Sequence, residues 1–252
     1  VIVSVVAVIY IINEEGSSSF KMTWLIFVMI VPVIGVGFYI YTKLELGKKL
    51  LRKRLEMLQE EIEPYMRQNE EVIQFMRSSR LANVNLSYFL YKYVGFPTYG
   101  NTTAEYFPVG EEKFGAMLKE LEKAEKFIFM EYFIVEEGIM WDSILAILKR
   151  KAQEGVEVRF MYDGMCSVAL LPYDYPKKLQ RMGIKCKQFE KIKPVLSTSQ
   201  NNRDHRKICV IDGKVAFTGG INLADEYINQ KERFGHWKDT AIMLKGDAVQ
   251  SF

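Results

Sequence analysis

The sequence predicts an α/β layered domain with a mixed, largely parallel sheet, preceded by a transmembrane helical hairpin. Helix-like and strand-like segments alternate at short intervals from residue 111 onward, a pattern typical of α/β domains. An uncharged run of 20 residues, 22–41, would span roughly 30 Å as a helix, which is the thickness of a bilayer core. Hydrophobic residues make up 49% of the chain, so it can bury a core, and this composition excludes an intrinsically disordered protein.

Residues 1–42 form the predicted hairpin. The first apolar run, VIVSVVAVIYII at 1–12, is too short to span a bilayer, and we interpret it as the end of an earlier spanning helix in a chain truncated at both ends. A signal peptide is the less favoured alternative because no small-residue cleavage pattern follows. The stretch 43–54 carries six basic residues against one acidic residue, which places everything after the hairpin on the cytoplasmic side of the membrane.

Residues 43–95 are predicted to be a basic cluster and a stalk or interfacial helix. Apolar residues recur at helical spacing up to Pro64, at Leu44, Leu51, Leu55, Leu58 and Ile62. An ordinary surface helix has the same pattern. The basic cluster should attract anionic lipid head groups, or it acts only as a topology anchor. The aromatic residues at 88, 89, 91 and 93 are expected in core or interfacial packing.

Residues 96–252 are predicted to be the layered domain, which opens with turns and short strands at 96–110. The expected helices are 111–124, 141–153 and 173–183, and the expected strands are 127–135, 156–163 and 184–190. In open α/β sheets, functional groups gather at the carboxyl ends of strands. Glu131, Asp163 and the loop after Glu190 are candidates on this ground, although for Asp163 we favour a solvated loop charge.

A hairpin is predicted where KICVID (207–212) and VAFTGG (215–220) flank an Asp-Gly turn. If the extended conformation begins by His205, the side chains of His205 and Lys207 project on the same face. Asp212 should accept hydrogen bonds from backbone N–H groups and hold the turn. Gly219 and Gly220 have no Cβ, so a ligand could approach the main chain there.

These residue types suit phosphoryl transfer. Asn222 stands just before LADEYIN (223–229), which looks like a helix, so an anion would face a helix N-terminus. Imidazole is a nucleophile near neutral pH that needs no metal, and lysine holds phosphate as a point charge. The three cysteines are far apart and form no cluster with histidine, so we expect no metal site and no cofactor, and we interpret the cysteines as small core residues.

The motif His205-x-Lys207-x4-Asp212-x6-Gly219-Gly220-x-Asn222 resembles the HKD motif of the phospholipase D superfamily. Together with FGHWKDT at 234–240, the stretches around 110–135 and 151–163, and the N-terminal anchor, it resembles the bacterial cardiolipin synthases. The resemblance implies a phospholipase D-like half-domain of α/β/α layers in a multi-pass protein of the bacterial cell membrane. It also implies that two phosphatidylglycerol molecules are converted to cardiolipin and glycerol through a phosphohistidine.

The resemblance assigns roles to several residues. His205 would be the nucleophile, or else its acid/base partner, and Lys207 and Asn222 would bind the phosphate. Asp239 would bond the other nitrogen of His205, and Asp212 would be structural. The implied partners are phosphatidylglycerol and other anionic phospholipids in the membrane. Glu131 lies in the MEYF stretch (130–133), which is near the site in relatives.

The sequence departs from the family in having a single HKD motif. The second half would come from a missing C-terminal region or from another chain. The loop YDGMCSVAL (162–170) is also less polar than in relatives. A phospholipase D-type hydrolase, a single-HKD dimeric nuclease and a non-catalytic lipid-binding half-domain stay open as alternatives. A net charge of only +3, concentrated before residue 55, argues against a nucleic-acid partner.

Overall fold

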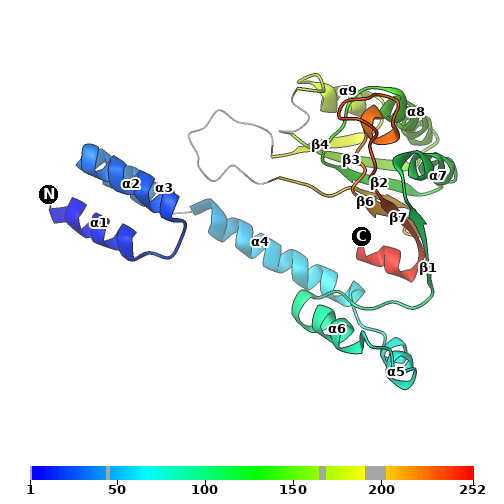
Figure 1. Ribbon diagram of the computed structural model, residues 1–252, viewed down its shortest axis with the longest axis horizontal. Helices are drawn as coiled ribbons and strands as arrows, with labels where there is room; N and C mark the ends of the chain where they lie inside the picture. The colour runs from blue at the N-terminus through cyan, green and yellow to red at the C-terminus, as the bar shows by residue number, and fades with distance from the viewer. Residues whose placement is uncertain (1, 44–45, 165–168, 191–202) are drawn as a thin grey trace. The chain divides into compact units, whose positions relative to one another are not determined.

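The chain forms two compact units, Val1–Arg67 and Gln68–Phe252 (Figure 1). The structure is a computed structural model that describes residues 2–43, 46–164, 169–190 and 203–252; the side chains of residues 42–51 are outside the described part. These include Lys43, Lys48 and Lys49 of the basic cluster. The division into 1–42, 43–95 and 96–252 stays a prediction.

The first unit is helical. Its elements are α1 (Ile2–Asn13), α2 (Ser18–Ile30), α3 (Pro32–Lys43), α4 (Leu46–Ile62) and the short 3-10 helix η1 (Glu63–Tyr65). Helix α1 packs with α2 and α3 around Ile11, Val28, Val36 and Tyr39. Helix α4 ends just before Pro64, as the sequence predicts.

The apolar run 22–41, expected as one helix, is divided between α2 and α3. Val31 leaves the helical region at φ −129° and ψ 77°, directly before Pro32. Proline has no N–H and disfavours the helical conformation in the residue before it, which explains the break. The 13 residues of α2 cover roughly 20 Å. Within the described residues, every helix falls short of the length and apolar character that a membrane crossing requires. The transmembrane hairpin is therefore not confirmed.

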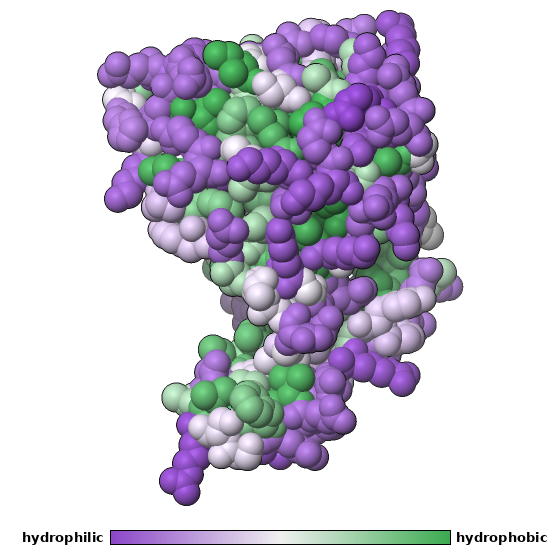
Figure 2. All heavy atoms as spheres, turned by 90° about the vertical axis from the view of Figure 1, so that its right-hand side faces the viewer, coloured by the Kyte–Doolittle hydropathy of each residue, from purple (hydrophilic) through white to green (hydrophobic). Residues whose placement is uncertain are grey.

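The second unit begins with a small helical segment. Its elements are α5 (Glu70–Ser78), α6 (Val84–Phe89) and one π-helical turn, η2 (Leu90–Val94). Gln68 ties the two ends of the segment together, because its amide donates to Thr98 O at 2.9 Å and accepts from Thr98 N at 2.8 Å. In the lowest part of Figure 2, where Figure 1 places α5 and α6, hydrophobic side chains are exposed among hydrophilic ones.

The rest of the second unit is an α/β layer structure in which the predicted strands and the three helices predicted between residues 111 and 183 are found. The helices are α7 (Gly110–Glu122), α8 (Ile139–Gln153) and α9 (Tyr175–Arg181). The strands are β1 (Thr102–Phe107), β2 (Phe127–Tyr132), β3 (Glu157–Asp163), β4 (Lys185–Phe189), β5 (Ile208–Ile211), β6 (Val215–Gly219) and β7 (Ala241–Gly246). Strand β7 was not expected, and the chain ends in the 3-10 helix η4 (Asp247–Ser251).

The sheet has the strand order β1-β7-β6-β5-β2-β3-β4 and is mixed. Only the pairs β2–β3 and β3–β4 are parallel, and the other four pairs are antiparallel. The prediction of a largely parallel sheet is therefore wrong. The two parallel pairs are connected by crossovers through the helices α8 and α9. The tight turn between β5 and β6 requires these two strands to be antiparallel. Strand β5 also pairs antiparallel with β2.

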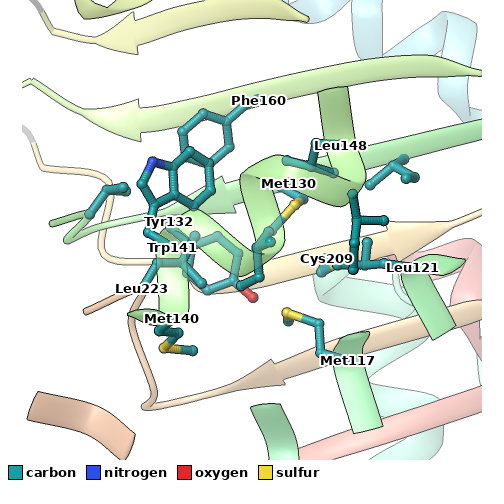
Figure 3. Close-up of a cluster of buried hydrophobic side chains, with 14 of the residues drawn as sticks. Met117, Leu121, Met130, Tyr132, Met140, Trp141, Leu148, Phe160, Cys209 and Leu223 are labelled. Atoms are coloured by element: carbon teal, nitrogen blue, oxygen red, sulfur yellow. The ribbon is translucent and has the colours of Figure 1, made fainter. Parts of the chain in front are cut away.

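The main core lies between one face of the sheet and the helices α7, α8 and α9. Figure 3 shows Met117 and Leu121 of α7 beside Cys209 of β5, and the Trp141 ring of α8 stacks on Phe160 with centroids 4.8 Å apart. Cys186 and Cys209 are buried, as expected, and Cys166 is outside the described residues.

The opposite face of the sheet carries Val249 of η4, which packs against Val210 and Ala216. Beside it lies a cavity of about 950 Å³, lined by residues that include Phe127, Phe129, Ile208 and Arg159. The second helix layer of the expected α/β/α arrangement is not seen among the described residues.

Candidate active site

The predicted hairpin is formed by β5 and β6, with Ile211 paired to Val215. Asp212 and Gly213 adopt φ values of 53° and 65°. The N–H of Lys214 donates to Ile211 O at 3.0 Å and closes the turn. Gly and Asp are the residues that tolerate this left-handed conformation, so the local sequence explains the turn.

The Asp212 carboxylate anchors this turn to the start of β2. It accepts hydrogen bonds from the backbone N–H groups of Glu125, Lys126 and Phe127, at 2.8, 2.7 and 2.8 Å. Burial opposes ionisation, but these donors and Lys214 together hold the pKa of Asp212 below its usual value. The contacts agree with a structural role, although the donors come from another segment and not from the turn itself.

Phe133, the first residue after β2, brings His205 and Lys207 together. The rings of Phe133 and His205 meet edge to face, with centroids 4.6 Å apart. The Nζ of Lys207 lies 5.1 Å from the centre of the same Phe133 ring and donates to the carbonyl oxygen of His205 at 2.7 Å. His205 is exposed and Lys207 is buried. An accessible imidazole and a desolvated ammonium therefore share one aromatic surface.

Asn222 is buried and bonded at both ends of its amide. Its oxygen accepts from the N–H of Ile134 at 3.0 Å, and its nitrogen donates to the hydroxyl of Tyr227 at 2.8 Å. Residues 133 and 134 thus contact His205, Lys207 and Asn222. The two residues after β2 gather three of the predicted site residues at one end of the sheet.

The helix expected after Asn222 is only the four-residue 3-10 helix η3 (Asp225–Ile228). Asp225 directs its carboxylate to the first turn of α8, where the N–H groups of Ile139 and Met140 donate to it at 2.9 and 2.8 Å. Asn229 follows at φ 54° and ends the turn. The prediction of a helix N-terminus facing the ligand is therefore wrong.

Gly219 and Gly220 make room for protein groups rather than for an open ligand approach. A Cβ on Gly219 would lie 2.6 Å from Cα of Ala241, and still closer to the carbonyl oxygen of Thr240. A Cβ on Gly220 would lie 2.5 Å from Oδ2 of Asp239, and closer to Oδ1. Because glycine has no side chain, the segment before β7 can pack directly against the hairpin, with the Asp239 carboxylate next to Gly220.

Asp239 is partly buried beside Gly220, and its Oδ1 accepts from the N–H of Thr240 at 2.7 Å. The expected hydrogen bond from Asp239 to His205 stays a prediction.

Glu131 contacts a different set of groups. It lines the cavity on the far face of the sheet, forms an ion pair with Arg206, and interacts with Asp204. Burial, together with the hydrogen bond and the charge of Asp204, raises the pKa of Glu131 to about 7, while Arg206 opposes this shift. The two partners of Glu131, Asp204 and Arg206, flank His205 in the sequence. Glu131 is therefore linked to the motif through residues 204–206.

Asp163 is fully buried, which overturns the interpretation of a solvated loop charge. Its Oδ2 accepts from the N–H of Asp204 at 2.9 Å, and Asp204 in turn accepts from the guanidinium of Arg206 at 3.2 Å. The carboxyl end of β3 therefore holds the residue directly before His205. Its position at a strand end was the available signal, but its buried partner could not be read from the sequence.

The profile described as "Cardiolipin synthase, PLD-like domain" matches residues 117–245, which include the hairpin, Asn222 and Asp239. The chain belongs to the phospholipase D-like cardiolipin synthase family. A second profile, "Phospholipase_D-nuclease N-terminal", matches residues 2–42 of this family member.

Curated relatives align with nearly the whole chain. An "Uncharacterized protein" of Streptococcus mutans is 50% identical over 98% of this chain and 53% of its own length. "Cardiolipin synthase 2" of Staphylococcus epidermidis is 32% identical over 98% of this chain and 52% of its own length. "Cardiolipin synthase" of Halalkalibacterium halodurans is 33% identical over 97% of this chain and 48% of its own length. The chain spans about half the length of these relatives.

Two loops of this phospholipase D-like domain lie outside the described residues. They are the loop after Glu190, at 191–202, and the centre of the apolar loop, at 165–168. In the part of the domain that the structure describes, no three His, Cys, Asp or Glu side chains are grouped as metal ligands would be. Sequence reasoning missed Phe133, whose apolar ring carries no chemical signal and shows its role only through its contacts.

Proposed function

We propose that this phospholipase D-like protein is a cardiolipin synthase that joins two phosphatidylglycerol molecules and releases glycerol. The contact of both His205 and Lys207 with the Phe133 ring supports this proposal most directly. With His205 as the proposed nucleophile and Lys207 as the cation, this pair matches what attack on a phosphodiester requires. Relatives named cardiolipin synthase, at 32–33% identity, support the choice of substrate.

In the proposed reaction, a ring nitrogen of His205 attacks the phosphorus of the first phosphatidylglycerol. The bond from phosphorus to the glycerol oxygen breaks, and that oxygen takes a proton from a general acid and leaves as glycerol. The hydroxyl of a second phosphatidylglycerol then attacks the phosphatidyl-histidine, gives its proton to the same group, and restores the imidazole. Each step breaks one bond to phosphorus and forms another, and the proton taken up by the leaving glycerol is replaced by the proton of the second phosphatidylglycerol.

The general acid is proposed to be a second HKD histidine, in a longer chain or in another copy, because this sequence carries one such motif. Lys207 would supply charge for the phosphate once it leaves the carbonyl of His205. The side-chain nitrogen of Asn222 can donate two hydrogen bonds, and one of them goes to the hydroxyl of Tyr227. We propose that the other is donated to a phosphate oxygen. Asp239 would orient the imidazole and stabilise its positive form.

The proposed location is the cytoplasmic side of the bacterial cell membrane, where the anionic substrates lie. The uncharged stretches of residues 1–42 and the basic stretch at 43–54 support this placement.

The test uses the native full-length protein in phosphatidylglycerol vesicles, with lipid products separated and glycerol release measured. We expect cardiolipin in the wild type and a loss of at least about 1,000-fold for His205→Ala, as for removal of other covalent nucleophiles. His236→Ala is the matched control, because His236 is the other histidine of the chain and is exposed. Cardiolipin formation that survives His205→Ala would refute the nucleophile assignment. Phosphatidic acid in place of cardiolipin would make the protein a hydrolase.

A further inference from the structure

Exposed aromatic and aliphatic side chains in the second unit are concentrated in residues 75–96, which we name the aromatic segment. Of the 15 exposed large hydrophobic residues described in this unit, ten lie in the segment. They are Phe75, Leu81, Leu86, Tyr88, Phe89, Leu90, Tyr91, Tyr93, Val94 and Phe96. Soluble surfaces rarely gather so many, and a concentration of this kind marks an interaction surface.

The packing of the segment itself does not involve burial of these exposed residues. Ile73 and Met76 of α5 and Ser87 of α6 are buried, and the hydroxyls of Ser87 and Thr98 form a hydrogen bond with each other. Gln68 closes the segment through its two bonds to Thr98. The exposed side chains therefore belong to a folded element and face outward from it.

The charge of the aromatic segment has one sign. No Asp or Glu occurs between Glu71 and Glu105, while Arg77, Arg80 and Lys92 fall within the segment. The ammonium of Lys92 lies 5.7 Å from the centre of the Tyr88 ring. Tyrosine with an apolar body and a polar tip, interleaved with cations, is the chemistry found where helices lie in a bilayer interface.

We propose that the aromatic segment docks on the surface of an anionic phospholipid bilayer. Its rings would enter the boundary between head groups and acyl chains, and its three cations would face lipid phosphates. The stretch carries cations and no acidic residue, and this charge complements the negative surface of an anionic bilayer. The choice of phosphatidylglycerol as the anionic lipid rests on the proposed function, whereas the surface itself does not. Docking would place the second unit, Gln68–Phe252, against the membrane that holds its proposed substrate.

The experiment introduces one tryptophan, Tyr93→Trp, into the full chain reconstituted in vesicles of phosphatidylcholine and phosphatidylglycerol. Brominated acyl chains quench tryptophan only at the bilayer, and the wild-type signal of Trp24, Trp141 and Trp237 is subtracted. We expect the added emission of Tyr93→Trp to be quenched. The matched probe is Lys149→Trp, which is exposed near the end of α8, outside the aromatic segment, and should not be quenched.

A variant with Arg77, Arg80 and Lys92 changed to Gln should lose this quenching, as should the use of phosphatidylcholine alone. Equal quenching of both probes, or of neither, would overturn the proposal. So would a blue-shifted emission of Tyr93→Trp that lipid bromine does not quench and that grows with protein concentration, because a second copy would then cover the segment. Quenching needs no turnover and can be repeated with His205→Ala. Failure of cardiolipin synthesis and failure of docking are therefore distinguishable.

Discussion

Replacing Gly220 with alanine should remove most catalytic activity and leave the fold intact. The new methyl group would lie 2.5 Å from Oδ2 and 2.6 Å from Cγ of Asp239, where ordinary contacts begin near 3.4 Å. The carboxylate must therefore retreat by roughly 1 Å. Gly220 does not adopt a positive φ, and the obstacle is the end of a flexible side chain, so the free energy of unfolding should change by less than about 1 kcal/mol.

The effect on rate follows from the proposed role of Asp239. A displacement of about 1 Å at a catalytic group costs about 100-fold in rate. The assay is the initial rate of cardiolipin formation in phosphatidylglycerol vesicles, with unfolding followed by the emission of the buried Trp141. In a protein that already carries Asp239→Asn, Gly220→Ala should cost little more. Full activity of Gly220→Ala, or an undiminished 100-fold loss in the Asp239→Asn background, would refute the reasoning.

Two other glycines serve as controls. Gly219→Ala meets backbone atoms of Thr240 and Ala241 at φ 149°, so it should destabilise the fold by about 2–4 kcal/mol. Gly115→Ala on α7 meets nothing within 4 Å and should stabilise the fold by about 0.5–1 kcal/mol without changing the rate. Gly219→Ala should therefore lower mainly the stability of the fold, whereas Gly220→Ala should lower mainly the reaction rate.

Three further predictions concern the same unit. Burial lowers the pKa of Lys113 to about 8, so its charge opposes folding, and the free energy of unfolding should rise from pH 8 toward 10.5. In urea titrations, Lys113→Met should abolish this rise. The control Lys119→Met, at an exposed site of α7, should retain it. Phe133→Leu should lower kcat about tenfold while Phe133→Tyr retains it, since the aromatic contact with the motif is kept; an unchanged kcat would contradict the positioning role. Asp212→Asn should lower the free energy of unfolding by about 1–3 kcal/mol at pH 7 and by less near pH 3, where the wild-type carboxylate is losing its charge.

The sequence alone was sufficient for features set by near neighbours. The Asp-Gly turn, the alternation of helices and strands, and the helix break at Pro64 all follow from local backbone preferences, and each is found. The HKD spacing predicted the family, because its fixed positions lie within one short stretch of chain. The same local reasoning overlooked Pro32, which divides the apolar run 22–41.

Tertiary structure decided how these pieces meet. Whether β5 enters parallel or antiparallel to β2 depends on contacts between residues about 80 positions apart, which no local preference encodes. The same holds for Phe133 against His205, for Asp163 beneath Asp204, and for Asp239 in the space left by Gly220. Turn and strand propensities act over a few residues, whereas burial and shape act between segments that only folding brings together.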